Sequence, residues 1–117
     1  MPARATALPL LLAPLVAGLV GCSGGDVKQT VGVTIKDNAC TLETDTIDAG
    51  KTAFDVSNDS GREAEAYVYA AGDKKVDEVE GIADGTSRKL TVSLEAGSYE
   101  FACKPEGKDV RAPFTVR

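Results

Sequence analysis

Three cysteines and the complete absence of histidine define the chemistry open to this 117-residue chain. Cys22 ends an apolar leader, Cys40 follows the first run of alternating residues, and Cys103 ends a run that contains two aromatic side chains. A cysteine thiol forms disulfides, binds soft metal ions or carries a covalent modification. Without an imidazole the chain has no serine–histidine triad and its acids have no matched base, so we expect it not to be an enzyme.

The first 21 residues have the pattern of a secretory signal peptide, with one arginine, an uncharged apolar stretch and small residues before Cys22. The stretch is too short to span a membrane comfortably. Its ending, Leu-Val-Gly-Cys at positions 19–22, resembles the lipobox of bacterial lipoproteins, whose cysteine takes a diacylglyceryl group and becomes the first residue after cleavage. We therefore expect residues 1–21 to be removed and Cys22 to be lipidated. Residues 22–30 would form a flexible tether on the extracytoplasmic face of the cell membrane. The alternative is an ordinary signal peptide that ends near a cysteine.

The chain is acidic, with a formal net charge of −5, and removal of the leader takes away only one arginine. The remaining residues are enough for one domain with one core. An acidic domain without tryptophan or histidine offers no electrostatic attraction for nucleic acid, so we exclude nucleic-acid binding. Acidity permits cation binding, although on its own it more often serves solubility.

Lipidation of Cys22 would leave an even pair, Cys40 and Cys103, in an oxidising extracytoplasmic compartment. The simplest expectation is a disulfide between them, and closing so long a loop would stabilise the fold by about 4 kcal/mol in the chain-entropy description. The alternative is a pair of thiolates that binds a soft metal ion. The oxidising compartment favours the disulfide.

Short runs of alternating apolar and polar residues, separated by turn residues, fill the rest of the chain. Such runs are typical of half-buried antiparallel strands. They begin at Val31, Phe54, Ala66, Leu90, Tyr99 and Phe114. No window of about eleven residues or more beyond the leader has the spacing of an amphipathic helix. We therefore predict an all-β, two-sheet sandwich of seven or eight strands, with the charged segment 73–80 along an edge.

The run Leu94-x-Ala96-Gly97-x-Tyr99-x-Phe101-x-Cys103 resembles the penultimate strand of cupredoxins, in which a cysteine ends the strand. In blue copper proteins histidine and methionine follow this cysteine, because the site needs imidazoles and a thiolate in a trigonal arrangement. Here Lys-Pro-Glu-Gly-Lys follows, and the mature chain contains neither histidine nor methionine. The ligand supply therefore excludes a blue-copper centre.

A second resemblance covers nearly the whole mature chain. Residues 33–40, 49–54 and 82–85, together with the strand that ends at Cys103, are similar to the cupredoxin-like domain of EfeO proteins, extracytoplasmic components of iron uptake systems. The resemblance implies a Greek-key β-sandwich over residues 31–117. In that family a helical, peptidase-like metal-binding domain usually follows, and we expect this protein to act without one of its own. An iron-uptake permease or a separate helical-domain protein is therefore the implied partner.

The same resemblance implies a ligand set. Glu65 matches a family glutamate, Glu78 and Glu80 fall in the acidic segment of the family, and Tyr67 stands where a second glutamate is common. Strand alternation puts Glu78 and Glu80 on one face, where carboxylates would suit a hard cation such as iron(III). The alternative is a solvated acidic edge that the neighbouring lysines partly neutralise.

From these observations we expect a membrane-anchored, cupredoxin-like lipoprotein that binds or delivers iron(III) or copper(II) as an EfeO-like accessory of iron uptake. The competing hypothesis is a metal-free β-sandwich module on the cell surface that presents a face or an edge to a partner protein.

Mass spectrometry of the mature protein, produced in a bacterium that processes lipoproteins, tests the anchor. We expect the chain to begin at Cys22 and to carry the added mass of the lipid. Cys22→Ala should abolish both the modification and the membrane association, because the thiol is the acceptor. A mature protein with an unmodified Cys22 would contradict this prediction.

Overall fold

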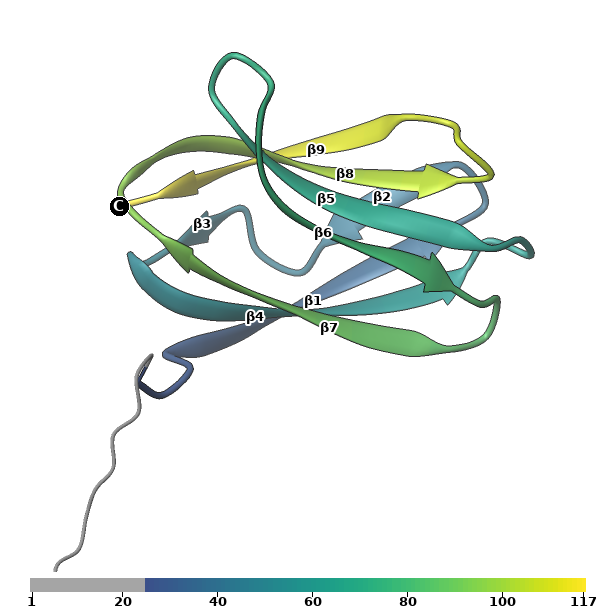
Figure 1. Cartoon of the computed structure of the whole chain (residues 1–117), viewed down its shortest axis with the longest axis horizontal. Coiled ribbons are helices and arrows are strands. Elements are labelled where there is room, and N and C mark those ends of the chain that lie inside the picture. The colour runs from purple at the N-terminus through teal and green to yellow at the C-terminus, as the bar shows by residue number, and fades with distance from the viewer. Residues whose placement is uncertain (1–24) are drawn as a thin grey trace, which may run out of the picture.

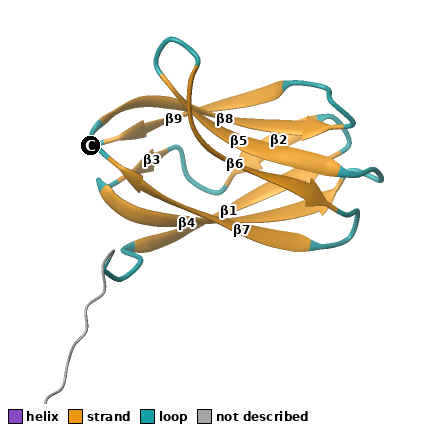
Figure 2. Ribbon diagram, in the orientation of Figure 1, coloured by secondary structure: helices purple, strands orange, loops and turns teal. Residues whose placement is uncertain are grey.

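The computed structural model describes residues 25–117, which form a sandwich of two β-sheets (Figures 1 and 2). The leader and the proposed lipid site at Cys22 lie outside the described residues. Across residues 25–117, no helix has the length and apolar character needed to cross a membrane.

The two sheets contain four and five strands. The first has the order β2-β1-β4-β7 and the second the order β3-β9-β8-β5-β6. The strands are β1 (Gln29–Lys36), β2 (Ala39–Leu42), β3 (Thr46–Ile47), β4 (Gly50–Asp59), β5 (Ala64–Ala70), β6 (Lys74–Ile82), β7 (Ser87–Leu94), β8 (Gly97–Pro105) and β9 (Val110–Val116).

This architecture confirms the predicted all-β sandwich, with two differences in detail. The described residues form nine strands, because the segment after the first strand divides into the short strands β2 and β3, one in each sheet. Two pairings, β1 with β4 and β3 with β9, are parallel, whereas the sequence pattern predicted antiparallel strands. Alternation of buried and exposed residues is the same in both directions, so it does not reveal the direction of a strand.

The charged segment lies where the sequence predicted. Strand β6 forms one edge of the five-stranded sheet and pairs only with β5 in the described part of the chain. The ladder between them is irregular, with shifts in register between Ala64 and Ala66 and between Val68 and Tyr69. Charged residues and bulges of this kind are tolerated at an edge, where one side of the strand faces water.

Aromatic side chains join the two sheets at the centre of the core. Phe54 of β4 packs against Phe101 of β8 and Phe114 of β9, with ring centroids 5.0 and 5.6 Å apart. Tyr99 stacks on Phe114 at 5.4 Å. All three phenylalanines are almost completely buried, so this cluster fixes the five-stranded sheet against the other.

A buried asparagine holds the end of the sandwich from which β5 starts. The amide nitrogen of Asn58 donates hydrogen bonds to the carbonyl oxygens of Arg62 (2.7 Å) and Ile82 (2.8 Å). Its side-chain oxygen accepts from the backbone and hydroxyl of Ser60. Because Arg62 precedes β5 and Ile82 ends β6, this residue sets the relative position of these two strands.

We expect Phe54→Ala to lower the free energy of unfolding by about 3–5 kcal/mol, because it leaves a cavity between the sheets. Phe54→Leu keeps most of the volume and should cost less than about half as much. Urea unfolding followed by circular dichroism measures both values. Equal losses for the two variants would mean that the phenylalanine ring is not the central contact.

Candidate functional site

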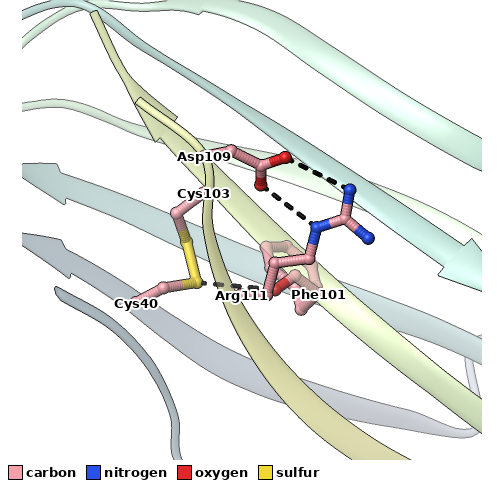
Figure 3. Close-up of a disulfide and its surroundings, with 5 residues drawn as sticks. All are labelled: Cys40, Phe101, Cys103, Asp109 and Arg111. Carbon is pink, nitrogen blue, oxygen red and sulfur yellow. Dashed lines mark hydrogen bonds and ion pairs between the residues drawn. A yellow bond between two sulfur atoms is a disulfide. The ribbon is translucent and has the colours of Figure 1, made fainter. Parts of the chain in front are cut away.

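The two remaining cysteines form a disulfide. Cys40 in β2 and Cys103 in β8 are joined by an S–S bond of 2.08 Å, with their Cα atoms 5.6 Å apart (Figure 3). This confirms the predicted disulfide and not the alternative of two free thiolates. The bond links the edge strand of the four-stranded sheet to the interior of the five-stranded sheet.

This arrangement does not fit a blue-copper centre. The sulfur of Cys103, which would be the thiolate ligand, is covalently bonded to Cys40 and fully buried. The chain contains no histidine to supply an imidazole. Residues 25–117 therefore offer none of the imidazole and thiolate donors that such a centre uses.

The three predicted glutamates lie together on the outer face of the five-stranded sheet. Ala64, Ala66 and Val68 of β5 point into the core, so Glu65 and Tyr67 point outward. Tyr67 is opposite Glu78 in the ladder, and the buried Val79 leaves Glu78 and Glu80 on that same outer side.

Tyr67 stands among these carboxylates. Its hydroxyl donates a hydrogen bond of 2.6 Å to Oε1 of Glu65. This bond raises the pKa of Tyr67 far above its usual range, and partial burial and the charges of Glu65, Glu78 and Glu80 add to the effect. A negative field from all three glutamates therefore acts on one phenol.

The carboxyl groups of Glu78 and Glu80 shift each other's pKa in opposite directions. Hydrogen bonding with Glu80 and then the ion pair with Lys75 lower the pKa of Glu78. The hydrogen bond and the negative charge of Glu78, followed by the charge of Glu65, raise the pKa of Glu80. Two carboxylates that lie so close resist full ionisation, and a bound cation would relieve that repulsion.

The side chains are brought together but are not arranged as a preformed metal site. Within residues 25–117 no group of three or more histidine, cysteine, aspartate or glutamate side chains is positioned to hold a metal ion. The carboxylate of Glu65 already accepts a hydrogen bond from Tyr67, and that of Glu78 already forms an ion pair with Lys75. The sequence analysis named Tyr67 only as the residue at the position of a family glutamate, although its spacing of two from Glu65 on a strand places both on one face.

Two basic side chains and a second tyrosine lie beside these glutamates on the same outer face. The ammonium group of Lys104 lies 4.2 Å from the ring centroid of Tyr67 and donates to the hydroxyl of Tyr69 at 3.2 Å. The guanidinium of Arg111 lies 4.3 Å from the ring of Tyr69, which itself stacks on Tyr67 at 5.8 Å. These side chains cover Ala102, an outward-facing residue of β8 that is 0% exposed. The sequence analysis missed this layer, because its contacts join strands far apart in the chain.

The raised pKa of Glu80 leads to a prediction for Glu80→Gln. A raised pKa in the folded state means that ionisation of Glu80 opposes folding as the pH rises through that pKa. The variant should therefore resist urea better than the parent protein at about pH 7 and match it at about pH 4, where Glu80 is protonated. Glu95→Gln, at an exposed turn position, is the control and should show no such difference between the two pH values. A Glu80→Gln advantage of equal size at both pH values would contradict the assignment.

Comparison with known proteins agrees with this fold. A family model described as a cupredoxin-like domain matches residues 10–116. The chain is 38% identical over 109 residues to the iron uptake system component EfeO of Escherichia coli (strain K12) and equally to that of Shigella flexneri. The match covers 90% of this chain and 28% of those relatives, so the chain spans little more than a quarter of their length.

Solved structures show the same fold at low identity. Auracyanin A, a blue copper protein from Chloroflexus aurantiacus, matches with a TM-score of 0.59 and 15% identity over 75% of this chain and 98% of its own. The auracyanin of Roseiflexus castenholzii matches with a TM-score of 0.57 and 12% identity over 79% and 99% of the two chains. The sandwich topology, the family match and the similarity to EfeO together show that this chain belongs to the cupredoxin-like domain family.

Proposed function

We propose that this protein is an extracytoplasmic, lipid-anchored accessory of iron uptake that binds a metal ion, iron(III) or copper(II), at Glu65, Glu78 and Glu80. The observation that carries the proposal is that Glu65, which accepts a hydrogen bond from the phenol of Tyr67, shares one sheet face with Glu78 and Glu80. Each of the four groups offers a hard oxygen donor, the kind that suits a highly charged cation.

The negative charge that the three glutamates bring to this face favours the binding of a cation. The three carboxylates raise the pKa of Tyr67, and the neighbouring Glu78 raises the pKa of Glu80. A metal ion would reverse both effects by stabilising the ionised forms. The glutamates are on the surface, so they are free to turn toward an ion without disturbing the core. Tyr67 would then be a further oxygen ligand beside Glu65.

Lys75 is the group that competes with the metal ion. Its ammonium group forms the ion pair with Glu78, so a bound cation must displace it. An exposed ion pair of this kind is weak, so a multivalent cation with several ligands can displace the lysine. Lys75 therefore tunes the affinity of the site and does not block it.

The relatives supply the biological setting. The matched proteins are described as iron uptake system components, and the similarity extends along 90% of this chain. An iron-uptake permease or a separate helical-domain protein would be the partner that receives the ion. We infer no catalytic role, because the acids of this face have no imidazole or comparable base beside them.

A metal-free interaction module is the second candidate. The ion pair between Lys75 and Glu78 and the bond between Tyr67 and Glu65 favour it, because they satisfy the acidic groups without a metal. In this case the outer face of the five-stranded sheet would be a recognition surface. The two functions differ in whether the glutamates bind a metal ion.

Calorimetric titration of the purified protein with chelate-buffered iron(III), copper(II) and calcium separates the two. We expect saturable binding of iron(III) or copper(II), weakened at least about tenfold in Glu65→Ala/Glu80→Ala because two ligands are lost. Asp55→Ala/Asp59→Ala removes the same charge from β4 in the other sheet and should bind as the parent does. If iron(III) binds, its visible absorption band should require the phenolate and disappear in Tyr67→Phe. Absence of heat, or equal heat for all variants, would favour the interaction module.

A further inference from the structure

A hollow lies at the opposite end of β5 from Glu65. It has a volume of about 230 Å³ and is lined by residues 70–73, residues 98–100 and Pro113. The turn between β5 and β6, which projects from the sandwich in Figure 1, forms one wall, and β8 and β9 form the other. At about 3.3 Å per residue along a strand, the hollow is roughly 17 Å from Glu65. It is therefore separate from the proposed metal site.

The lining of this hollow contains two carboxylates, Asp73 and Glu100, and both form ion pairs with Arg111 beside it. Arg111 donates to Asp73 at 2.8 Å, to Glu100 at 3.1 Å and to Asp109 at 3.1 Å. These contacts raise the pKa of Arg111, and its guanidinium lowers the pKa of Asp109. Three carboxylates thus share one cation, and no lysine forms an ion pair with them within residues 25–117. The side chains of Asp73 and Glu100 are 75% and 46% exposed, so a second cation can reach them.

The size and lining of the hollow restrict what it accepts. Pockets for whole small-molecule ligands occupy about 300–1,000 Å³, so this hollow suits a single side chain. Ala70, Tyr99 and Pro113 supply apolar surface, whereas Asp73 and Glu100 supply charge. Lysine and arginine combine an apolar stem with a cationic end, and this combination matches both parts of the lining. An acidic side chain would be repelled.

We propose that this hollow receives a lysine or arginine side chain of a partner protein. The adjoining pair of Tyr69 and Arg111, whose guanidinium lies 4.3 Å from the tyrosine ring, completes the docking surface. Tyrosine and arginine held in fixed positions are typical of the residues that dominate protein interfaces, because little conformational freedom is lost on binding. The stacking of Tyr69 on Tyr67 and the complete burial of Ala102 beneath them show that this surface is already formed in the unbound chain. The proposal is independent of metal binding at Glu65, Glu78 and Glu80.

An NMR titration of the metal-free full chain in detergent micelles tests this proposal. The probe is a blocked Gly-Gly-Arg-Gly-Gly peptide, and its citrulline counterpart is the neutral control of the same shape. We expect saturable shifts of the backbone amides of Ala71, Gly72, Ser98 and Glu100 with the arginine peptide only. Shifts of equal size with the citrulline peptide, or none with the arginine peptide, would overturn the proposal.

Charge neutralisation supplies the matched variants. Asp73→Asn/Glu100→Gln should weaken binding of the arginine peptide about fivefold, the effect expected from the loss of an exposed ion pair. Asp55→Asn/Asp59→Asn makes the same change in net charge on β4 and should leave the affinity unchanged. Equal weakening in both double variants would overturn the proposal, because it would show attraction to the overall charge rather than to the hollow. Unchanged thermal unfolding of each variant confirms that the fold is retained.

Discussion

One constraint determines the outer face of the five-stranded sheet. It is the burial of three β5 residues, Ala64, Ala66 and Val68, against the opposite sheet. Each of these residues is at most 1% exposed. Since side chains alternate along a strand, their burial forces Glu65, Tyr67 and Tyr69 onto the outer side. A shift of one residue in the register of β5 would put these polar groups into the core and expose the apolar ones. The core therefore determines which side chains are available for recognition.

The pairing of β5 with its two neighbours also fixes which of their side chains lie beside Glu65 and Tyr67. Pairing with β6 brings Glu78 opposite Tyr67, and pairing with β8 brings Lys104 opposite Glu65. The aromatic contacts of Phe54 and the disulfide then hold the five-stranded sheet against the other sheet. The acidic and cationic groups of the face thus occupy positions that the interior fixes, although they themselves lie in water.

The sequence predicted the features that depend on local alternation or on composition. The all-β sandwich, the edge position of the charged segment and the disulfide partners belong to this class, as does the common face of Glu78 and Glu80. The parallel pairing of β1 with β4 was not predictable, because alternation contains no information about direction. Arg111 and Asp73, which are 38 positions apart, meet only because a turn bends toward β9. Such a contact has no signature in either segment alone.

The comparison with auracyanin shows that one fold can hold different sets of functional side chains. The two chains share a sandwich at 15% identity, and the auracyanin is a blue copper protein. Here the cysteine near the end of β8 is tied to β2 by a disulfide, and the charged groups gather on an outer sheet face instead. The fold supplies a rigid frame, whereas the residues placed on it decide what is bound.

The shifts in register along β6 bear on how copies of this protein behave when crowded together. A regular open edge is a template on which the strand of another molecule can add, and repeated addition leads to aggregates. Here the bulges disturb the spacing of the free backbone groups, and Val76 emerges at one of them between charged neighbours. An incoming strand would find neither a continuous hydrogen-bonding ladder nor a uniform apolar face. The irregular edge thus disfavours edge-to-edge pairing of strands between molecules, even at high local concentration.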